Sequence, residues 1–429
     1  MRDKTFLIGW TAALAFFGVA LLVTNSVAAS NDFIMYSFNG SHGTLPDSGL
    51  IERSGNFYGT TNSGGAYGVG TVFELSPREG GGWTEKVLYS FKNNGRDGKS
   101  PQAALVFDAH GNLYGTTYTG GLYLGGTVFE LSPEENGSWT ETVLHTFGSG
   151  HDGASPCAAL IFDTHGNLYG TTFGGGENQG GTVFELSLRD GSWTETVLYS
   201  FQDSDDGNPD DGSSPNGGLI FDAAGNLYGT TYTGGAYGIH QYGTVFELTP
   251  KHGGGWTEKV LHSFGSGTDG QNPSASLVFD THGNLYGTTY AGGAYQDGTV
   301  FKLSPRQGGG WTETVLHNFD FVGGLSDGLG PYSNLILDVA GNLYGTTSEG
   351  GNSSCNSRRG CGTVFELSPR DGGWTETVLH RFGVYLGDGQ YGDGQFPFGG
   401  LILDSHGNLY GTTQHGGAYG GGAVFEIEH

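Results

Sequence analysis

Glutamates recur at a regular interval along the chain, and carboxylates at a fixed spacing are the residue type that glycoside hydrolysis uses. Two carboxylates on either side of a glycosidic bond act as acid and as nucleophile or base. Each glutamate here lies two residues after a tryptophan, in Trp-Thr-Glu, and each recurring segment has only one. We therefore interpret them as a rim of charge and not as a paired catalytic site. They are Glu85, Glu141, Glu195, Glu258, Glu313 and Glu376.

A second group of acids has the oxygen chemistry that Ca²⁺ requires. Ca²⁺ takes six to eight oxygen ligands, and the segment DSDDGNPDDG at 203–212 is rich in them. The closing Glu of an EF-hand is missing, however, and Asp-Gly is also an ordinary turn. We expect no cofactor, with Ca²⁺ as the alternative. The candidate ligands are Asp203, Asp205, Asp206 and Asp211, and an Asp-Gly pair also occurs at Asp97, Asp152, Asp269, Asp327 and Asp393.

Aromatic and basic side chains in irregular segments are candidates for binding a ligand, because aromatic rings can pack against sugars or peptides. Tyrosines also recur in Gly-Gly-Ala-Tyr or Gly-Gly-Leu-Tyr, at Tyr67, Tyr123, Tyr237, Tyr295 and Tyr419, where packing within a glycine-rich loop is the alternative. Residues in insertions that other repeats lack are better candidates for a single site. They are Tyr237, His240, Tyr242, Tyr385, Tyr391, Phe396, Arg358 and Arg359.

The chain has three cysteines. Cys355 and Cys361, in CNSRRGC, are close enough in sequence to form a disulfide in an oxidising compartment. Cys157 is left unpaired in SPCAALIFD, at the start of an apolar strand, which favours a buried and inert thiol over a nucleophile.

The elements that would position these residues repeat along the chain. GNLYGTT begins at Gly111 and occurs five more times, and a variant, GNFYGTT, occurs at 55–61. The steps between copies are 56, 55, 59, 58, 58 and 66 residues. Each unit contains four short runs rich in β-branched and aromatic residues, such as AALVFD, NLYGTT, GTVFELSP and WTETVLHTF, which predict strands.

Seven units of four strands predict an all-β fold, a seven-bladed β-propeller. A solenoid is the alternative, and the ends of the repeats decide between them. The last unit lacks its fourth strand, whereas FIMYSF at 33–38 aligns with the fourth-strand segment KVLYSF at 86–91. Pairing of this N-terminal strand with the last unit would close a ring and leave no incomplete blade.

The sequence motifs that the repeats share have structural explanations. In DAHGN, Asp108 is expected to accept backbone N–H groups and Gly111 to adopt a positive φ in a tight hairpin. Gly115, inside a strand, indicates a close approach between neighbouring blades. The tryptophan that opens each fourth strand contributes about 2–3 kcal/mol by burial. We therefore assign a structural role to the repeated motifs.

Differences in loop length point to one face of the propeller. The turns after the first strand keep a constant length, whereas the loop after the second strand is longest in blades 4 and 6. The links between blades are longest at 202–214, 320–330 and 383–396. Since loops on a rigid scaffold carry specificity, we expect a binding site on this face, around blades 4 to 7.

Charge and the N-terminal segment indicate an exported protein. Residues 1–29 contain a short basic start, an apolar run and small residues around Ala28, which predicts a signal peptide; an uncleaved anchor is the alternative. The expected mature chain, 30–429, is one propeller domain with no further membrane span, and we expect a monomer. A net charge of −26 argues against nucleic-acid binding.

The set GNLYGTT, GTVFELSP and GGWTETVLHSF resembles the GloVer tandem repeat family of secreted bacterial proteins over essentially the whole mature chain. The resemblance implies a propeller-like extracellular protein without an assigned activity. The Gly-Gly doublet, the aromatic of the third strand and the tryptophan of the fourth resemble Kelch repeats more distantly.

We therefore predict a secreted, non-enzymatic binding module that recognises an extracellular ligand, glycan or protein, through its variable loops. The alternatives are an extracellular carbohydrate-active lyase or hydrolase and a structural envelope protein.

Overall fold

The computed structural model describes residues 32–203, 210–237, 242–321, 327–352, 355, 359–387 and 390–429. The proposed signal peptide lies outside them. All regular elements in the described part of the chain are β-strands. No helix in that part is long and apolar enough to cross a membrane.

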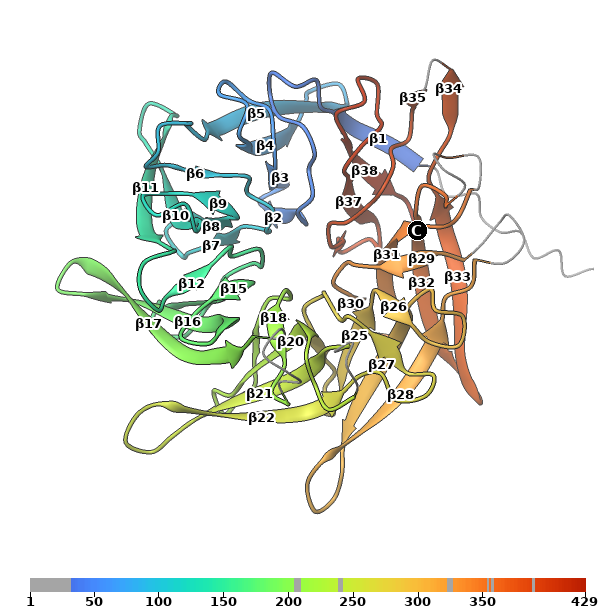
Figure 1. The fold of residues 1–429 in the computed structure, drawn as a ribbon. Coiled ribbons are helices and arrows are strands. Elements are labelled where there is room, and N and C mark those ends of the chain that lie inside the picture. Colours follow the sequence, from blue (N-terminus) through green and yellow to red (C-terminus); the bar gives the residue numbers. More distant parts are fainter. Residues whose placement is uncertain are drawn as a thin grey trace, which may run out of the picture.

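Seven antiparallel sheets of four strands surround a central axis, as the repeats predicted (Figure 1). The strands of each blade are given from the axis outward. Blade 1 consists of β2 (Ile51–Arg53), β3 (Asn56–Thr61), β4 (Thr71–Pro77) and β5 (Trp83–Ser90), and blade 2 of β7 (Val106–Phe107), β8 (Leu113–Thr117), β10 (Thr127–Pro133) and β11 (Trp139–Thr146). Blade 3 consists of β13 (Ile161–Phe162), β14 (Leu168–Thr172), β16 (Gln179–Arg189) and β17 (Ser192–Gln202), and blade 4 of β19 (Ile220–Phe221), β20 (Leu227–Thr233), β21 (Thr244–Pro250) and β22 (Trp256–Ser263). Blades 5 to 7 are formed by β24 (Val278–Phe279), β25 (Leu285–Thr289), β27 (Thr299–Pro305) and β28 (Trp311–Asn318); by β30 (Ile336–Leu337), β31 (Leu343–Glu349), β32 (Thr363–Arg370) and β33 (Gly373–Arg381); and by β36 (Ile402–Leu403), β37 (Leu409–Thr413), β38 (Ala423–Ile427) and β1 (Asp32–Ser37).

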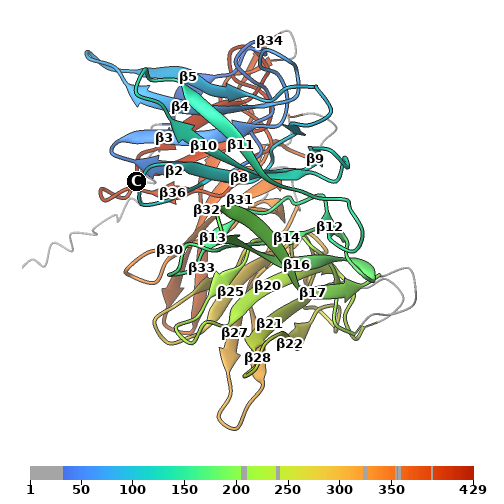
Figure 2. The same cartoon turned by 90° about the vertical axis from the view of Figure 1, so that its left-hand side faces the viewer.

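Short strands connect the links between blades to the loops that follow the second strands. They are β6 (Gly98–Lys99) with β9 (Thr119–Gly120), β12 (Gly153–Ala154) with β15 (Gly174–Gly175), β18 (Ser213–Pro215) with β20, β23 (Gly270–Gln271) with β26 (Ala291–Gly292), and β29 (Leu329–Pro331) with β31. The link from blade 6 to blade 7 forms its own hairpin, β34 (Tyr385–Gly387) and β35 (Gln390–Tyr391). The side view shows β34 at the upper edge of the ring (Figure 2).

The ring closes at blade 7, where β1 pairs with β38 in an antiparallel register from Asp32↔Ile427 to Ser37↔Ala423. Figure 1 shows this N-terminal strand, in blue, beside the red C-terminal strands. The closure is therefore the predicted one, and no blade is left incomplete.

The core consists of apolar layers between adjacent blades. One layer joins Tyr58 and Phe91 of blade 1 to Leu105 and Phe129 of blade 2. Each of these side chains is at most 8% exposed. The same combination recurs around the ring, including the layer that joins blades 7 and 1. The aromatic residues of the repeated motifs therefore pack each blade against the next.

The repeated turn has the predicted conformation. Oδ1 of Asp108 accepts hydrogen bonds from the backbone N–H groups of His110, Gly111 and Asn112 at 2.7–2.8 Å, and Gly111 has φ +97°.

The explanation for Gly115 was wrong in one respect. A Cβ at this position would lie 2.7 Å from Cζ of Phe129 and 2.8 Å from Cδ2 of Leu105. Both residues belong to the same blade as Gly115, so the glycine makes room for its own blade's core and not for a neighbouring blade.

Candidate functional site

A cavity of about 620 Å³ lies at the propeller axis and is lined by all seven blades. Its wall comes from two positions of the repeat: in all seven repeats, the segment between a recurrent buried proline and the first strand, and in five of them also the residue directly after GTT. Because first strands begin and second strands end on the same side, the cavity lies at the end of the axis that carries the links and the long loops.

The threonines of the repeated GTT position this wall. The hydroxyl of Thr116 donates to the carbonyl of Ala158 in the wall segment of the next blade at 3.3 Å. The equivalent hydroxyl of Thr412 donates to the carbonyl of Ser48 at 2.8 Å and so joins blade 7 to blade 1. Equivalent bonds are made by Thr60, Thr171, Thr230, Thr288 and Thr346. An invariant hydroxyl therefore holds the backbone directly beside a position whose side chain differs from blade to blade.

The side chains that follow the recurrent proline differ in every blade. They are Asp47, Gln102, Cys157, Asn216, Ser274, Tyr332 and Phe398, and all seven line the cavity. The residues after GTT also vary, and Asn62, Tyr118, Phe173, Tyr232 and Gln414 line it too. Loop lengths, on which the predicted binding face was based, do not reveal this site; the signal in the sequence is the residue type at these two aligned positions.

A hydrogen-bonded chain crosses part of the cavity. The thiol of Cys157 donates to Oδ1 of Asn216 at 3.0 Å, and Nδ2 of Asn216 donates to the hydroxyl of Tyr332 at 2.7 Å. Burial raises the pKa of both the Cys157 thiol and the Tyr332 phenol to about 12. Cys157 precedes its strand and faces the cavity, where it is a neutral thiol.

Asp47 is the carboxylate of the cavity wall. Its Oδ2 accepts a hydrogen bond from Nδ2 of Asn62 at 2.9 Å, whereas its buried Oδ1 accepts none from the described residues. Burial raises the pKa of this carboxyl above its ordinary value, and the side chains of Asn62, Gln414 and His415 oppose the increase.

A larger groove, of about 960 Å³, lies at the seam between blades 2 and 3. Most of its wall comes from β11 and β17, whose sequences recur in other blades. It contains Glu195 beside Asp152, and burial together with Asp152 raises the pKa of Glu195 to about 7. Glu177 departs from the pattern of the other glycine-rich loops, whereas Tyr123 is one of the tyrosines that recur in them.

The interpretation of the glutamates as single rim charges was wrong, because an aspartate of the preceding link lies close to five of them. The pairs are Asp97 with Glu141, Asp152 with Glu195, Asp211 with Glu258, Asp269 with Glu313 and Asp327 with Glu376. The sixth, Glu85, has His42 at 2.8 Å. Each Glu Oε1 is buried without a hydrogen bond among the described residues. The arrangement recurs at successive seams, so we assign it to the fold.

The candidate residues of the insertions fall into separate groups. Tyr385 and Tyr391 lie together on the β34–β35 hairpin, with ring centroids 5.4 Å apart. Phe396 lies edge-on to His415 at 5.9 Å, and the exposed Arg359 forms an ion pair with Glu349 at 3.1 Å.

In blade 4, Tyr237 is exposed, whereas Tyr242 packs against the core layer between blades 4 and 5. Arg358 and His240 lie outside the described residues. The five tyrosines of the glycine-rich loops are 45–66% exposed, so they form part of the surface.

The candidate calcium ligands are only partly described. Asp205 and Asp206 lie outside the described residues, and Asp211 accepts the hydroxyl of Tyr199 at 2.8 Å. The described residues include no group of three or more His, Cys, Asp or Glu arranged to hold a metal ion.

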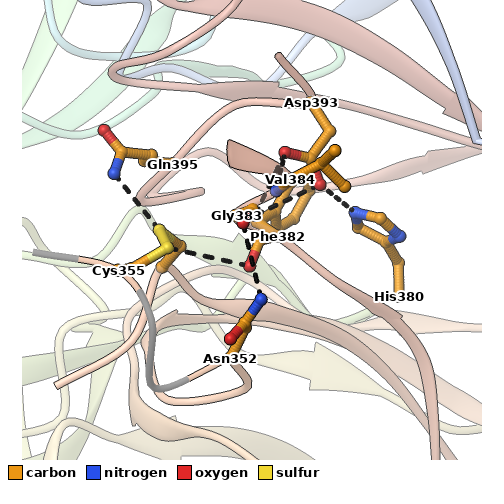
Figure 3. The surroundings of a disulfide bond; sticks show 9 residues. Asn352, Cys355, His380, Phe382, Gly383, Val384, Asp393 and Gln395 are labelled. Atoms are coloured by element: carbon orange, nitrogen blue, oxygen red, sulfur yellow. Dashed lines mark hydrogen bonds and ion pairs between the residues drawn. A yellow bond between two sulfur atoms is a disulfide. The ribbon is translucent and has the colours of Figure 1, made fainter. Parts of the chain in front are cut away.

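A disulfide joins Cys355 to Cys361 in the long loop of blade 6, and it contacts the long link to blade 7 (Figure 3). Nε2 of Gln395 donates to the sulfur of Cys361 at 3.2 Å. In the same link, Asp393 accepts the N–H groups of Gly383 and Val384 and pairs with His380 at 3.1 Å. Two insertions are thus fastened together.

These features define a seven-bladed β-propeller with a uniform frame and an axial cavity whose wall differs from blade to blade. The chain belongs to the Gloeobacter/Verrucomicrobia repeat family, whose model matches residues 2–211 and 206–391. No curated protein matches the chain in sequence.

Solved structures with similar folds are distant. The periplasmic gluconolactonase PpgL of Pseudomonas aeruginosa is 14% identical, with a TM-score of 0.47 over 78% of this chain and 84% of that one. A protein of unknown function from Dyadobacter fermentans is 12% identical, with a TM-score of 0.43 over 94% and 100% of the two chains. A putative oxidoreductase (glucose dehydrogenase) from Thermus thermophilus is 17% identical, with a TM-score of 0.42 over 75% and 95%. The activities in these names describe those proteins alone.

Proposed function

We propose that this chain is a secreted binding protein whose ligand occupies the axial cavity. The observation that supports the proposal is the concentration of sequence differences in the cavity wall: the position after the recurrent proline carries a different residue in each of the seven repeats. Packing alone would allow the same residue at each position, as it does in the core layers. A cavity of this size also falls within the range of small-molecule sites.

Export through the N-terminal segment belongs to this proposal, as does recognition of an extracellular ligand. The loops of blades 4, 6 and 7 surround the same end of the axis, so their tyrosines would form the rim of the site. We infer that selectivity is set at the wall and that the rim contributes further contacts.

The proposal is tested by filling the cavity. A panel of neutral sugars, polyols, sugar acids, amines and short peptides is screened for ligands that raise the melting temperature. At a concentration 100-fold above Kd, a ligand stabilises the fold by about 2.7 kcal/mol, or about 3 °C for a domain of this size. In Gln102→Trp, a bulky ring on the wall should abolish the shift.

Tyr385→Ala, on the rim hairpin, is the matched control and should retain most of the shift. A ligand whose shift survives Gln102→Trp but disappears in Tyr385→Ala or Tyr391→Ala would place the site on the rim and contradict the axial proposal. Turnover of any ligand in the panel would favour the alternative of a carbohydrate-active enzyme.

A further inference from the structure

The axial cavity has an unusual combination of lining residues: one carboxylate, several aromatic rings and no positive charge. Its aromatic residues are Tyr118, Phe173, Tyr232, Tyr332 and Phe398. Asp47 is the acid, and neither Lys nor Arg occurs among the described residues that line the cavity. An anionic ligand would therefore bring a second negative charge beside Asp47 with no Lys or Arg of the lining to offset it.

Two polar groups on the aromatic side already have partners within the wall. The Tyr332 hydroxyl and the Cys157 thiol are both hydrogen-bonded to Asn216. The Tyr332 ring lies edge-on to Phe398, with centroids 5.5 Å apart, and edge-on to Tyr290 at 6.2 Å. Since the phenol stays neutral, what these side chains offer a ligand is mainly the π-surface of their rings.

Asp47 leaves a negative charge that the protein compensates incompletely. Asn62 donates to Oδ2 at 2.9 Å, and the side chains of Gln414 and His415 also lower the pKa of this carboxyl, but Oδ1 is buried without a hydrogen bond from the described residues. A buried carboxylate with so few donors is costly unless a positive charge is close. A cation in the cavity would supply that charge and would also be attracted to the faces of the aromatic rings.

We propose that the axial cavity binds an organic cation, an amine or quaternary ammonium group that pairs with Asp47 and packs against the aromatic rings of the wall. The proposal rests on the axial site of the proposed function and names its ligand class. The net charge of −26 favours the approach of cations over anions.

The test compares choline with its neutral isostere 3,3-dimethylbutan-1-ol, in which carbon replaces the quaternary nitrogen. Titration calorimetry of the mature chain at low and at physiological salt should show choline binding at least about tenfold more tightly than the isostere. Asp47→Asn should remove most of that preference and leave the weak binding of the isostere unchanged. Phe398→Leu should also weaken choline more than the isostere, which provides a second variant if the first folds poorly.

Glu376→Gln, which neutralises a buried acid at a seam, is the matched control and should bind choline as the parent does. Occupancy is reported independently by Cys157, the free cysteine of the chain. Its raised pKa makes alkylation slow, so the reaction is followed for hours in alkaline buffer, where a small thiolate fraction forms, and choline in the cavity should slow it further.

Two failures are distinguishable. If the isostere or methyl glucoside binds as tightly as choline, with no effect of Asp47→Asn but with loss in Gln102→Trp, the cation inference is overturned and the axial site stands. If choline and primary amines all fail to bind, the cation inference is also wrong. If the screened ligands bind without protecting Cys157 and without any effect of Gln102→Trp, the proposed function itself is wrong.

Discussion

Buried carboxylates occur in two regions of this propeller, and the regions differ in how often the arrangement is repeated. At the seams between blades, a glutamate of one fourth strand lies beside an aspartate of the preceding link at five successive positions. At the axis, Asp47 occurs once, and the other repeats have Gln, Cys, Asn, Ser, Tyr or Phe in its place.

The difference separates the frame, by which we mean the repeated strands, core layers and seams of the blades, from the axial site. A buried carboxylate lowers the stability of the fold. Where such a carboxylate recurs at each seam, the fold itself must tolerate the loss, whereas one that occurs once is more simply explained by a ligand. The two regions should therefore respond differently to the same kind of substitution.

The largest expected effect comes from adding a methyl group to the frame and to the wall. In Gly115→Ala, the new Cβ would lie 2.7 Å from Phe129 in a fully packed core, so the free energy of unfolding should fall by about 2–3 kcal/mol. In Gly400→Ala, at the cavity, the nearest atom is Cβ of Asn334 at 3.5 Å, and the change should stay within about 0.5 kcal/mol. Urea denaturation measures both, and equal losses would contradict the separation of frame and wall.

The next largest expected effect is the loss of stability when the cysteines, which are not part of the repeated motifs, are replaced. The disulfide Cys355–Cys361 closes a loop with a sequence separation of 6, and replacing both residues with serine should cost about 2 kcal/mol through the entropy of the unfolded chain. Cys157→Ser keeps a donor for Asn216 and should cost less than about 1 kcal/mol. Thermal unfolding under oxidising conditions tests the pair; a larger loss for Cys157→Ser would make it part of the frame.

The smallest effect concerns the pH dependence of the two kinds of acid. Burial, together with Asp327 and against the opposing Arg381, raises the pKa of Glu376 to about 8 from 4.5. The folded state therefore binds the proton more tightly than the unfolded state, so this group's contribution to stability falls as pH rises from about 4.5 to 8. Glu376→Gln should flatten the profile and stabilise the fold by about 1–2 kcal/mol at pH 8.5, since one pKa unit corresponds to about 1.4 kcal/mol and partial exposure reduces the gain.

Asp47→Asn sharpens this comparison. The raised pKa of Asp47 has the same sign, so the variant should also gain stability above the ordinary pKa of an aspartate. Only Asp47→Asn should lose the ligand. Denaturation at several pH values measures the free energy of unfolding, with Glu428→Gln as an exposed control. If its pH dependence were unchanged in both buried variants, neither buried acid would lower the stability of the fold.

The sequence predicted the frame well because the frame is periodic. Seven copies of one motif, the hairpin acid at Asp108 and the fourth-strand segment at 33–38 predicted the seven blades and their closure. The axial site was not predicted, because its residues are scattered singly through seven units and become neighbours only when the ring forms. Asp47 and Tyr332 are far apart in the chain, and no local pattern links them.

The seam pairs were missed for the same reason. Glu376 and Asp327 belong to different repeats, and only the packing of one blade on the next brings them together. In contrast, the long loops were predicted correctly as elaborations, but loop length alone did not indicate which of their residues face one another.

The pairing of β1 with β38 also sets the order in which the fold is completed. The first strand in the chain finds its partner only after the last blade has been made, and Thr412 reaches Ser48 at the same late point. A chain that emerges N-terminus first therefore carries an unpaired strand edge through nearly all of its synthesis. Because contacts of such long range form slowly, the time for which this edge stays unpaired is expected to limit the yield of folded protein more than the stability of any single blade does.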